Sequence, residues 1–142
     1  MNDEFRVTIQ SEDDILEARQ EGRELGLRLG FGPSALAVIA TAISELARNL
    51  LLYARNGSII CWAINREPQQ GIVIQATDEG PGIPNIEAAM KDGYSTSGGL
   101  GLGLPGVRRM MDEFAIVSRH GRGTTVTAIK WKEPIPKSSS GE

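Results

Sequence analysis

The sequence predicts an α+β fold in two layers, with helices on one face of a mixed, mainly antiparallel sheet. Two long segments, residues 11–30 and 33–52, place apolar residues at spacings of three and four, which is the period of a helix with one buried face. Several short apolar runs bounded by glycine, proline and polar residues indicate strands, most of them in hairpins. This pattern in a chain of 142 residues is typical of one α+β domain, here residues 1–132.

The first strand and the first helix are predicted near the N-terminus. Residues 5–9 alternate apolar and polar side chains, as a half-buried strand does. Ser11, with Asp14 three residues later, resembles the cap of a helix that ends near Gly30. The buried face of this helix is expected to carry Ile15, Ala18, Gly22, Leu25 and Leu29.

The second helix is predicted to begin at Pro33, which suits a first helical turn. Its buried stripe is expected to contain Leu36, Ile39, Ala40, Ile43, Leu46, Ala47, Leu50 and Leu51. The other face contains Thr41, Glu45, Arg48, Asn49 and Leu52. Because Glu45 and Asn49 are four residues apart, their side chains project toward the same point.

The rest of the domain is predicted to form two hairpins and two shorter helices. Strands are expected at residues 58–64, 72–77, 114–119 and 124–131, with connections at 65–71 and 121–123. The helices are expected at residues 86–91 and from Pro105 to about Asp112. The Pro/Ser-rich tail, residues 133–142, has no apolar periodicity and is predicted to lie outside the fold.

Composition disfavours several classes of function. The net charge is −3 and no basic block is present, so nucleic acid is a poor candidate partner. No apolar run approaches the ~18–20 residues of a membrane-spanning helix, and the polar start is unlike a signal peptide, so we expect a cytoplasmic protein without a membrane partner.

Cys61 and His120 are the only cysteine and histidine, which excludes a cysteine-based zinc site and disfavours Ser-His-Asp chemistry. Cys61 lies in an apolar run and is expected to be buried.

Two glycine-rich segments carry the clearest functional signal. Residues 98–106, GGLGLGLPG, satisfy the dinucleotide fingerprint G-x-G-x-x-G, but a loop precedes them and Val126 stands where the fingerprint needs an acid. A glycine loop that enters a helix can bind an anion through backbone N–H groups, although a plain surface loop has the same composition. Residues 78–82, DEGPG, follow a predicted strand, where Asp78 could accept hydrogen bonds from a planar ligand; a plain turn explains them as well.

Together with the helix that carries Glu45 and Asn49, these segments favour a nucleotide site. The chain then has an acid and an amide on one helix face, a D-x-G-x-G turn after a strand, and a glycine loop before a helix. ATP fits all three features. Oxygen ligands suit Mg²⁺, which usually keeps several waters and binds substrate phosphates. The sequence therefore predicts a site for ATP and Mg²⁺.

The same segments, in the same order, resemble the nucleotide-binding boxes of the GHKL superfamily, named for gyrase, Hsp90, histidine kinases and MutL. They are ELARN at residues 45–49, DEGPG at 78–82 and GGLGLGLPG at 98–106. More narrowly, residues 92–114 and the closing TAIKW resemble the anti-sigma-factor type serine/threonine kinases, which include the stressosome switch kinases. The resemblance covers residues 5–132 and implies the Bergerat-type α/β sandwich.

The resemblance also implies roles for individual residues. Glu45 would deprotonate the acceptor serine, and Asn49 would be a Mg²⁺ ligand. Asp78 would bind the adenine amino group, and Thr124 would support the adenine side through its hydroxyl. The remaining nucleotide-binding positions would be Gly80 and Gly82 in the turn, and Gly99, Leu100, Gly101, Leu102, Gly103 and Leu104 in the ATP lid and the helix start.

The implied activity is an ATP-dependent protein-serine kinase that phosphorylates a STAS-domain antagonist protein in bacterial stress signalling. The implied partners also include a STAS-domain scaffold of a stressosome and a downstream effector such as a PP2C-type phosphatase. An alternative is a nucleotide-dependent anti-sigma or adaptor module with little or no kinase activity. Glu45 argues for the kinase, because ATP binding needs no base, but a Glu on an exposed helix face is commonly only a solvated charge.

Overall fold

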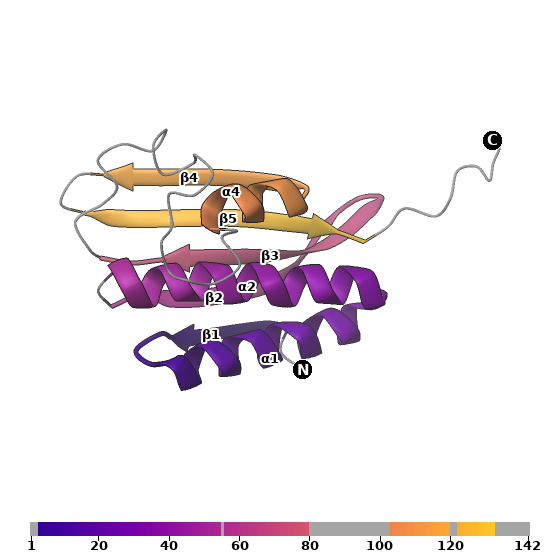
Figure 1. Ribbon diagram of the computed structural model, residues 1–142. Coiled ribbons are helices and arrows are strands. Elements are labelled where there is room, and N and C mark those ends of the chain that lie inside the picture. Colours follow the sequence, from indigo (N-terminus) through magenta and orange to yellow (C-terminus); the bar gives the residue numbers. More distant parts are fainter. Residues whose placement is uncertain (1–2, 55, 80–102, 120–121, 133–142) are drawn as a thin grey trace.

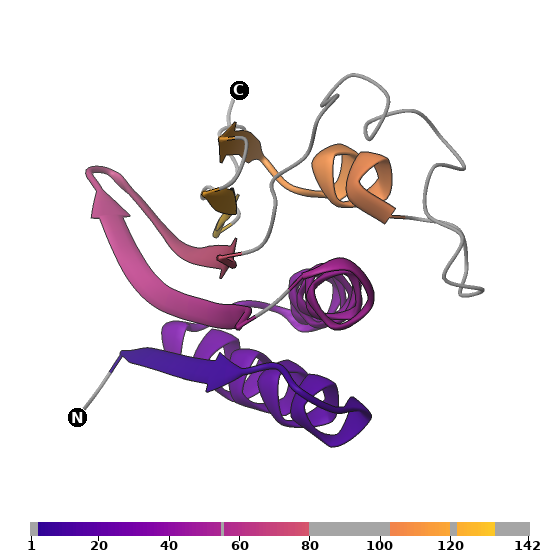
Figure 2. The same cartoon turned by 90° about the vertical axis from the view of Figure 1, so that its left-hand side faces the viewer.

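The computed structural model describes residues 3–54, 56–79, 103–119 and 122–132, which form two layers (Figures 1 and 2). The helices are α1 (Glu12–Leu29), α2 (Pro33–Tyr53) and α4 (Gly103–Met110). The strands are β1 (Glu4–Thr8), β2 (Ser58–Arg66), β3 (Gln69–Thr77), β4 (Glu113–Arg119) and β5 (Gly123–Trp131). Figure 2 shows these helices on one side of the sheet, with α2 between α1 and α4.

The strands form one sheet in the order β1-β2-β3-β5-β4, and each neighbouring pair is antiparallel. The predicted fold class, helices on one face of a mainly antiparallel sheet, is therefore confirmed. No parallel pair occurs among the strands of the described ranges. The chain runs from β3 to β4 at the edge and returns through β5, so β5 lies beside β3.

Both ends of α1 are capped as the sequence predicts. The Ser11 hydroxyl accepts a hydrogen bond from the Asp14 backbone N–H at 3.4 Å, and the Asp14 carboxylate accepts one from the Gln10 backbone N–H at 2.8 Å. Gly30 ends the helix with a φ of 92°, in the left-handed region that favours glycine. The N–H groups of Gly30 and Phe31 then satisfy carbonyl oxygens of the last turn.

Helix α2 packs closely against α1, and this contact sets the position of the predicted catalytic helix. A Cβ atom at Gly22 of α1 would collide with Ile43 Cδ1, and one at Gly26 would lie 2.7 Å from Leu36 Cδ2. Eight residues of α2 are buried. They are Leu36, Ile39, Ala40, Ala42, Ile43, Leu46, Ala47 and Leu50.

By length and composition, α2 could cross a membrane, which corrects the expectation that no segment approaches this length. That expectation counted uninterrupted apolar runs, whereas the average over the helix tolerates the polar side chains of Ser44, Glu45 and Arg48. The buried residues of α2, except Ala40, belong to the main core cluster of the fold. A core helix passes the same test as a membrane span.

Several predicted element boundaries are wrong. Strands β2 and β3 extend to Arg66 and from Gln69, so most of the predicted connection is paired strand. Polar residues can pair at the end of a hairpin because the ladder uses backbone groups, which do not require buried side chains. Helix α4 begins at Gly103, two residues before the predicted start at Pro105. Proline is tolerated within a first helical turn, where N–H groups have no intrahelical acceptor.

The sheet face without helices carries a second, smaller apolar cluster. It consists of Val73, Ile129 and Trp131, with Trp62 and Ile64 packed against them. The indole N–H of Trp131 donates to Glu113 Oε2 at 2.9 Å, and the Arg66 guanidinium lies 5.0 Å from the centre of the indole ring. The tryptophan side chain thus covers apolar residues that no helix covers.

Candidate functional site

One half of the candidate site forms where α2 meets the start of α4. Glu45 Oε1 accepts a hydrogen bond from the backbone N–H of Gly103 at 3.3 Å. N–H groups in the first turn of a helix lack intrahelical acceptors, and the positive end of the helix dipole favours a carboxylate there. The structure therefore brings together the predicted acid and the predicted helix start, which are 58 residues apart in sequence.

The first residues of α4 have different roles in holding this helix. Gly103 has a φ of 52°, which few residues other than glycine adopt readily. Leu104 is buried in the main core cluster together with Val107 and Met111. The Leu104 side chain therefore anchors α4, and what this residue can offer a nucleotide is its backbone.

Asn49 lies one turn after Glu45 on α2, and both residues are half-buried. An amide oxygen next to a carboxylate is a suitable donor for Mg²⁺, which takes few protein oxygens when nucleotide phosphates supply others. These donors fit a Mg²⁺ ion that enters with ATP. Across the described ranges, no cluster of three or more His, Cys, Asp or Glu could hold a metal ion.

The other half of the candidate site forms at the end of β3 and the start of β5. The Asp78 backbone N–H donates to the carbonyl oxygen of Thr124 at 3.0 Å. Thr124 is only 7% exposed, and its hydroxyl lies 2.9 Å from the Ser118 hydroxyl. Gly123, with a φ of 98°, precedes Thr124, and a Cβ atom there would collide with the carbonyl oxygen of Asp78. We name Asp78, Gly123 and Thr124 the adenine corner, after the role that the family resemblance implies.

Gly123 is the functional position that sequence reasoning missed. The sequence indicated only a turn at residues 121–123, and it identified Thr124 but not the glycine before it. The close approach to Asp78 depends on β5 pairing with β3, where Thr125 lies opposite Thr77. A glycine directly before a predicted binding residue was the available signal.

These two halves lie at the same end of the molecule. In Figure 1 the C-terminal end of α2, the end of β3 and the start of β5 are all on the left. The structure therefore collects Glu45 and Asn49 on α2 with Asp78 and Thr124 on the sheet at one end.

Several predicted positions lie outside the described residues. They are Gly80, Gly82, Gly99, Leu100, Gly101, Leu102, His120 and the helix expected at residues 86–91. Their assignments stay predictions.

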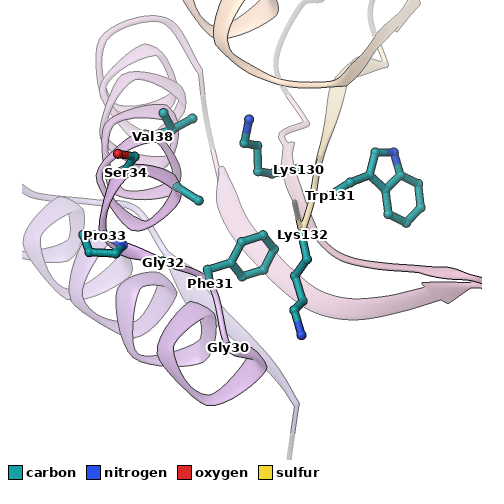
Figure 3. A pocket seen from close by; sticks show the side chains of 10 residues that line it. Gly30, Phe31, Gly32, Pro33, Ser34, Val38, Lys130, Trp131 and Lys132 are labelled. Atoms are coloured by element: carbon teal, nitrogen blue, oxygen red, sulfur yellow. The ribbon is translucent and has the colours of Figure 1, made fainter. Parts of the chain in front are cut away.

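A cavity of about 470 Å³ lies at the opposite end of α2 (Figure 3). It is lined by residues 30–35, Val38 and residues 130–132. Figure 3 shows the Phe31 side chain directed toward Lys132, which follows the end of β5 at Trp131. None of the predicted site residues lines this cavity, so it is distinct from the predicted nucleotide site.

Cys61 is fully buried, which confirms the expectation from its apolar surroundings. Burial raises the pKa of the thiol above its ordinary value, because an apolar environment disfavours the thiolate. A neutral, inaccessible thiol is a structural side chain rather than a nucleophile.

Comparison with known proteins identifies the family of this chain. Residues 36–135 match the family model described as histidine kinase-, DNA gyrase B-, and HSP90-like ATPase. The serine/threonine-protein kinase RsbT of Bacillus subtilis is 54% identical over 131 residues, which are 92% of this chain and 98% of that protein. The anti-sigma F factor of Caldanaerobacter subterraneus is 32% identical over 100 residues, 68% of this chain and 70% of that protein.

A solved structure of the RsbU and RsbW domains of a Mycobacterium tuberculosis protein has a similar fold, with a TM-score of 0.63. The match covers 92% of this chain and 33% of that chain, at 22% identity. This chain therefore spans about a third of the solved chain. At this identity the likeness concerns the fold alone.

Proposed function

Because this chain belongs to the histidine kinase-, DNA gyrase B- and HSP90-like ATPases, and is a serine/threonine-protein kinase among them, we propose that it phosphorylates a serine of a STAS-domain antagonist protein. The observation that carries the proposal is the contact of Glu45 with the N-terminus of α4. This contact puts a carboxylate beside backbone N–H groups suited to a phosphate. A base and a phosphate-binding helix start are what phosphoryl transfer to a hydroxyl requires.

In the proposed reaction, Glu45 receives the proton of the serine hydroxyl. The serine oxygen forms a bond to the γ-phosphorus of ATP, the bond between that phosphorus and the β,γ-bridging oxygen breaks, and ADP leaves. Asn49 would hold Mg²⁺, which would neutralise negative charge on the phosphates. The first N–H groups of α4 would orient the γ-phosphate, and they become available when Gly103 exchanges Glu45 for a phosphate oxygen.

The adenine corner would hold the other end of ATP. The Asp78 carboxylate would accept a hydrogen bond from the adenine amino group, and Thr124 would support this side. Support for these roles comes from the backbone bond between Asp78 and Thr124, which holds the two residues at one end of the sheet. The remaining contacts to ATP would come from Gly80, Gly82 and residues 99–102, which lie outside the described residues.

We further propose that phosphorylation changes the partner of the kinase, in the cytoplasm. Before transfer it would bind the STAS-domain antagonist and a STAS-domain scaffold of a stressosome. After transfer it would bind a downstream effector such as a PP2C-type phosphatase. Neither nucleic acid nor a membrane is a proposed partner, since the chain is acidic overall.

The similarity to anti-sigma F factors supports a second candidate function. A nucleotide-dependent binding module could sequester a sigma factor or effector with little or no phosphoryl transfer. Such a module needs the adenine corner and Asn49 but not a base at position 45. The two functions therefore differ in what the loss of the Glu45 carboxylate does.

The test is transfer of labelled γ-phosphate from Mg-ATP to the STAS-domain protein encoded nearest this gene. Glu45→Ala and Glu45→Gln are compared with the wild type, and ATP binding is measured in parallel. We expect serine labelling to fall by ~10²–10⁴-fold in both variants, the usual contribution of a general base. The glutamine variant keeps an oxygen that can accept the Gly103 N–H bond, so its ATP affinity should stay within about twofold of the wild type.

Labelling of the partner by Glu45→Gln at the wild-type rate would show that Glu45 is not the base. If all three proteins bind ATP while none labels the partner, the binding-module function is correct instead.

A further inference from the structure

The side of α2 that faces away from the sheet lies between α1 and α4 (Figure 2). Two contacts define its edges, because Arg48 faces α1 through Glu12 and Glu45 faces α4 through Gly103. With about 3.6 residues per turn, Leu52 lies between these edges, one turn beyond Arg48. A substrate segment that reaches Glu45 along the C-terminal part of this side therefore lies against Arg48, Leu52 or both.

The contact that Arg48 makes with α1 is weak. Its Nη1 lies 3.8 Å from Glu12 Oε1, and the two side chains are 31% and 74% exposed. This distance is too long for a hydrogen bond, and exposed ion pairs contribute little to stability. A stronger acceptor from outside could therefore displace Glu12.

The Nε atom of Arg48 is covered by protein atoms and has no hydrogen-bond partner. Nearly all buried donors in folded proteins have an acceptor, so an exception calls for an explanation. A guanidinium presents its N–H groups in a planar fork that matches a carboxylate. In the conformation seen here Arg48 leaves part of that fork unused, one turn from Glu45.

Leu52 adds an apolar contact surface next to this fork. It is 49% exposed, and the next residue, Tyr53, is 53% exposed. Single exposed leucines are common and need no special explanation. Leu52 is of interest because it lies one turn from Arg48, whose Nε donor has no partner, on the same side of α2 as Glu45.

We propose that Arg48 and Leu52 form a docking strip for the segment of the substrate protein that carries the acceptor serine. Arg48 leaves Glu12 and binds a carboxylate close to that serine, which satisfies the Nε donor. Leu52 packs against an apolar side chain of the same segment. This inference rests on the proposed function, because it takes Glu45 as the point that the serine must reach.

The test is steady-state phosphorylation of the same STAS-domain protein by the wild type, Arg48→Met, Arg48→Lys and Leu52→Ala. Each Asp or Glu within about five residues of the acceptor serine is replaced, one at a time, by its amide. Arg6→Met is the matched control, since Arg6 is an exposed arginine of β1 on the helix-free face of the sheet. Denaturant unfolding confirms that each variant is folded.

We expect Arg48→Met to raise the KM for the protein substrate at least about tenfold, with kcat and the KM for ATP unchanged. One amide substitution in the partner should have the same effect, and combining it with Arg48→Met should add nothing, as in a double-mutant cycle. Arg48→Lys should recover only part of the loss, because an ammonium lacks the planar fork. Leu52→Ala should raise the KM about threefold, and Arg6→Met should leave it unchanged.

Three results would overturn this inference. Unchanged KM values in Arg48→Met and Leu52→Ala would exclude the docking strip, while wild-type labelling would leave the kinase function standing. A selective loss of affinity for ATP over ADP in Arg48→Met would instead assign Arg48 to the γ-phosphate. No labelling by the wild type with ATP bound would contradict the proposed function and this inference together.

Discussion

The two halves of the candidate site are built differently. At the adenine corner, a backbone hydrogen bond of 3.0 Å joins Asp78 to Thr124, and the left-handed glycine at position 123 permits the close approach. On the phosphate side, the Gly103 backbone N–H of α4 donates a hydrogen bond of 3.3 Å to the Glu45 carboxylate of α2. The first half is part of the sheet, and the second depends on one polar contact between two helices that otherwise pack through apolar side chains.

This difference suggests that one half of the site is rigid and that the other half can exchange a hydrogen-bond partner. A corner formed by strand pairing is preformed, so the proposed binding of adenine would need no rearrangement there. A carboxylate held by one helix N–H can exchange that partner for a substrate, which is what a base must do during a reaction. Substitutions at the adenine corner should therefore change stability, and substitutions of Glu45 should change activity.

Gly123→Ala should have the largest effect on stability. A side chain in the left-handed region costs roughly 1–2 kcal/mol, and the collision with the Asp78 carbonyl adds to it, so we expect a loss of about 2–4 kcal/mol in unfolding free energy. Urea denaturation measures this loss, and ATP affinity should fall with it. Gly32→Ser is the control, because Gly32 is an N-cap with open space around a Cβ and an ordinary φ of −79°.

Equal unfolding free energies for Gly123→Ala and Gly32→Ser would contradict the preformed corner.

On the phosphate side, Glu45→Gln should change the unfolding free energy by less than about 0.5 kcal/mol, as most partly exposed substitutions do.

Cys61 in β2, which pairs with β3, should make the sheet sensitive to alkaline pH. Its pKa is raised in the fold from an ordinary value of 9.0, so the neutral thiol stabilises the protein fully below pH 9, and this contribution is lost as pH rises further. Between pH 8 and pH 10 the wild type should lose about 1.4 kcal/mol more unfolding free energy than Cys61→Ala. Identical pH dependence in the two proteins would show that the thiol ionises as easily in the fold as in the unfolded chain.

Thr124→Val should have a smaller effect on stability than Gly123→Ala. The change keeps the shape and removes the bond to the Ser118 hydroxyl, so we expect a loss of about 1 kcal/mol, together with weaker ATP binding. Thr127→Val is a matched control on the same strand, where the hydroxyl lies 3.3 Å from Gln75 Nε2 on the helix-free face. This control should lose similar stability and keep its ATP affinity. Weaker ATP binding in both variants would mean that the adenine corner has no special role.

Much of the fold was predictable from local patterns in the sequence. The cap at Ser11, the end of α1 at Gly30 and the buried stripe of α2 follow from helical periodicity and from the chemistry of helix ends. The extent of the β2–β3 hairpin and the start of α4 were not predictable in this way. Exposed polar residues resemble a loop whether or not their backbone is paired, and a first helical turn is compatible with both glycine and proline.

The candidate site was predictable in its members and not in its contacts. Three separate motifs identified Glu45, Asn49, Asp78 and the glycine loop, and the predicted family and enzyme class are confirmed by the relatives. The bond from Gly103 to Glu45 and the role of Gly123 came only from the structure.

The sequence by itself determined where helices and strands form, which face of each is buried, and which residue types are available for ATP chemistry, because these depend on neighbours within a few positions. Only the tertiary structure decided that β5 lies between β3 and β4, and this strand order puts Thr124 beside Asp78. It likewise decided that α4 meets α2 at Glu45. Contacts between distant segments depend on how whole layers pack, and no local pattern along the chain encodes the partner of each segment.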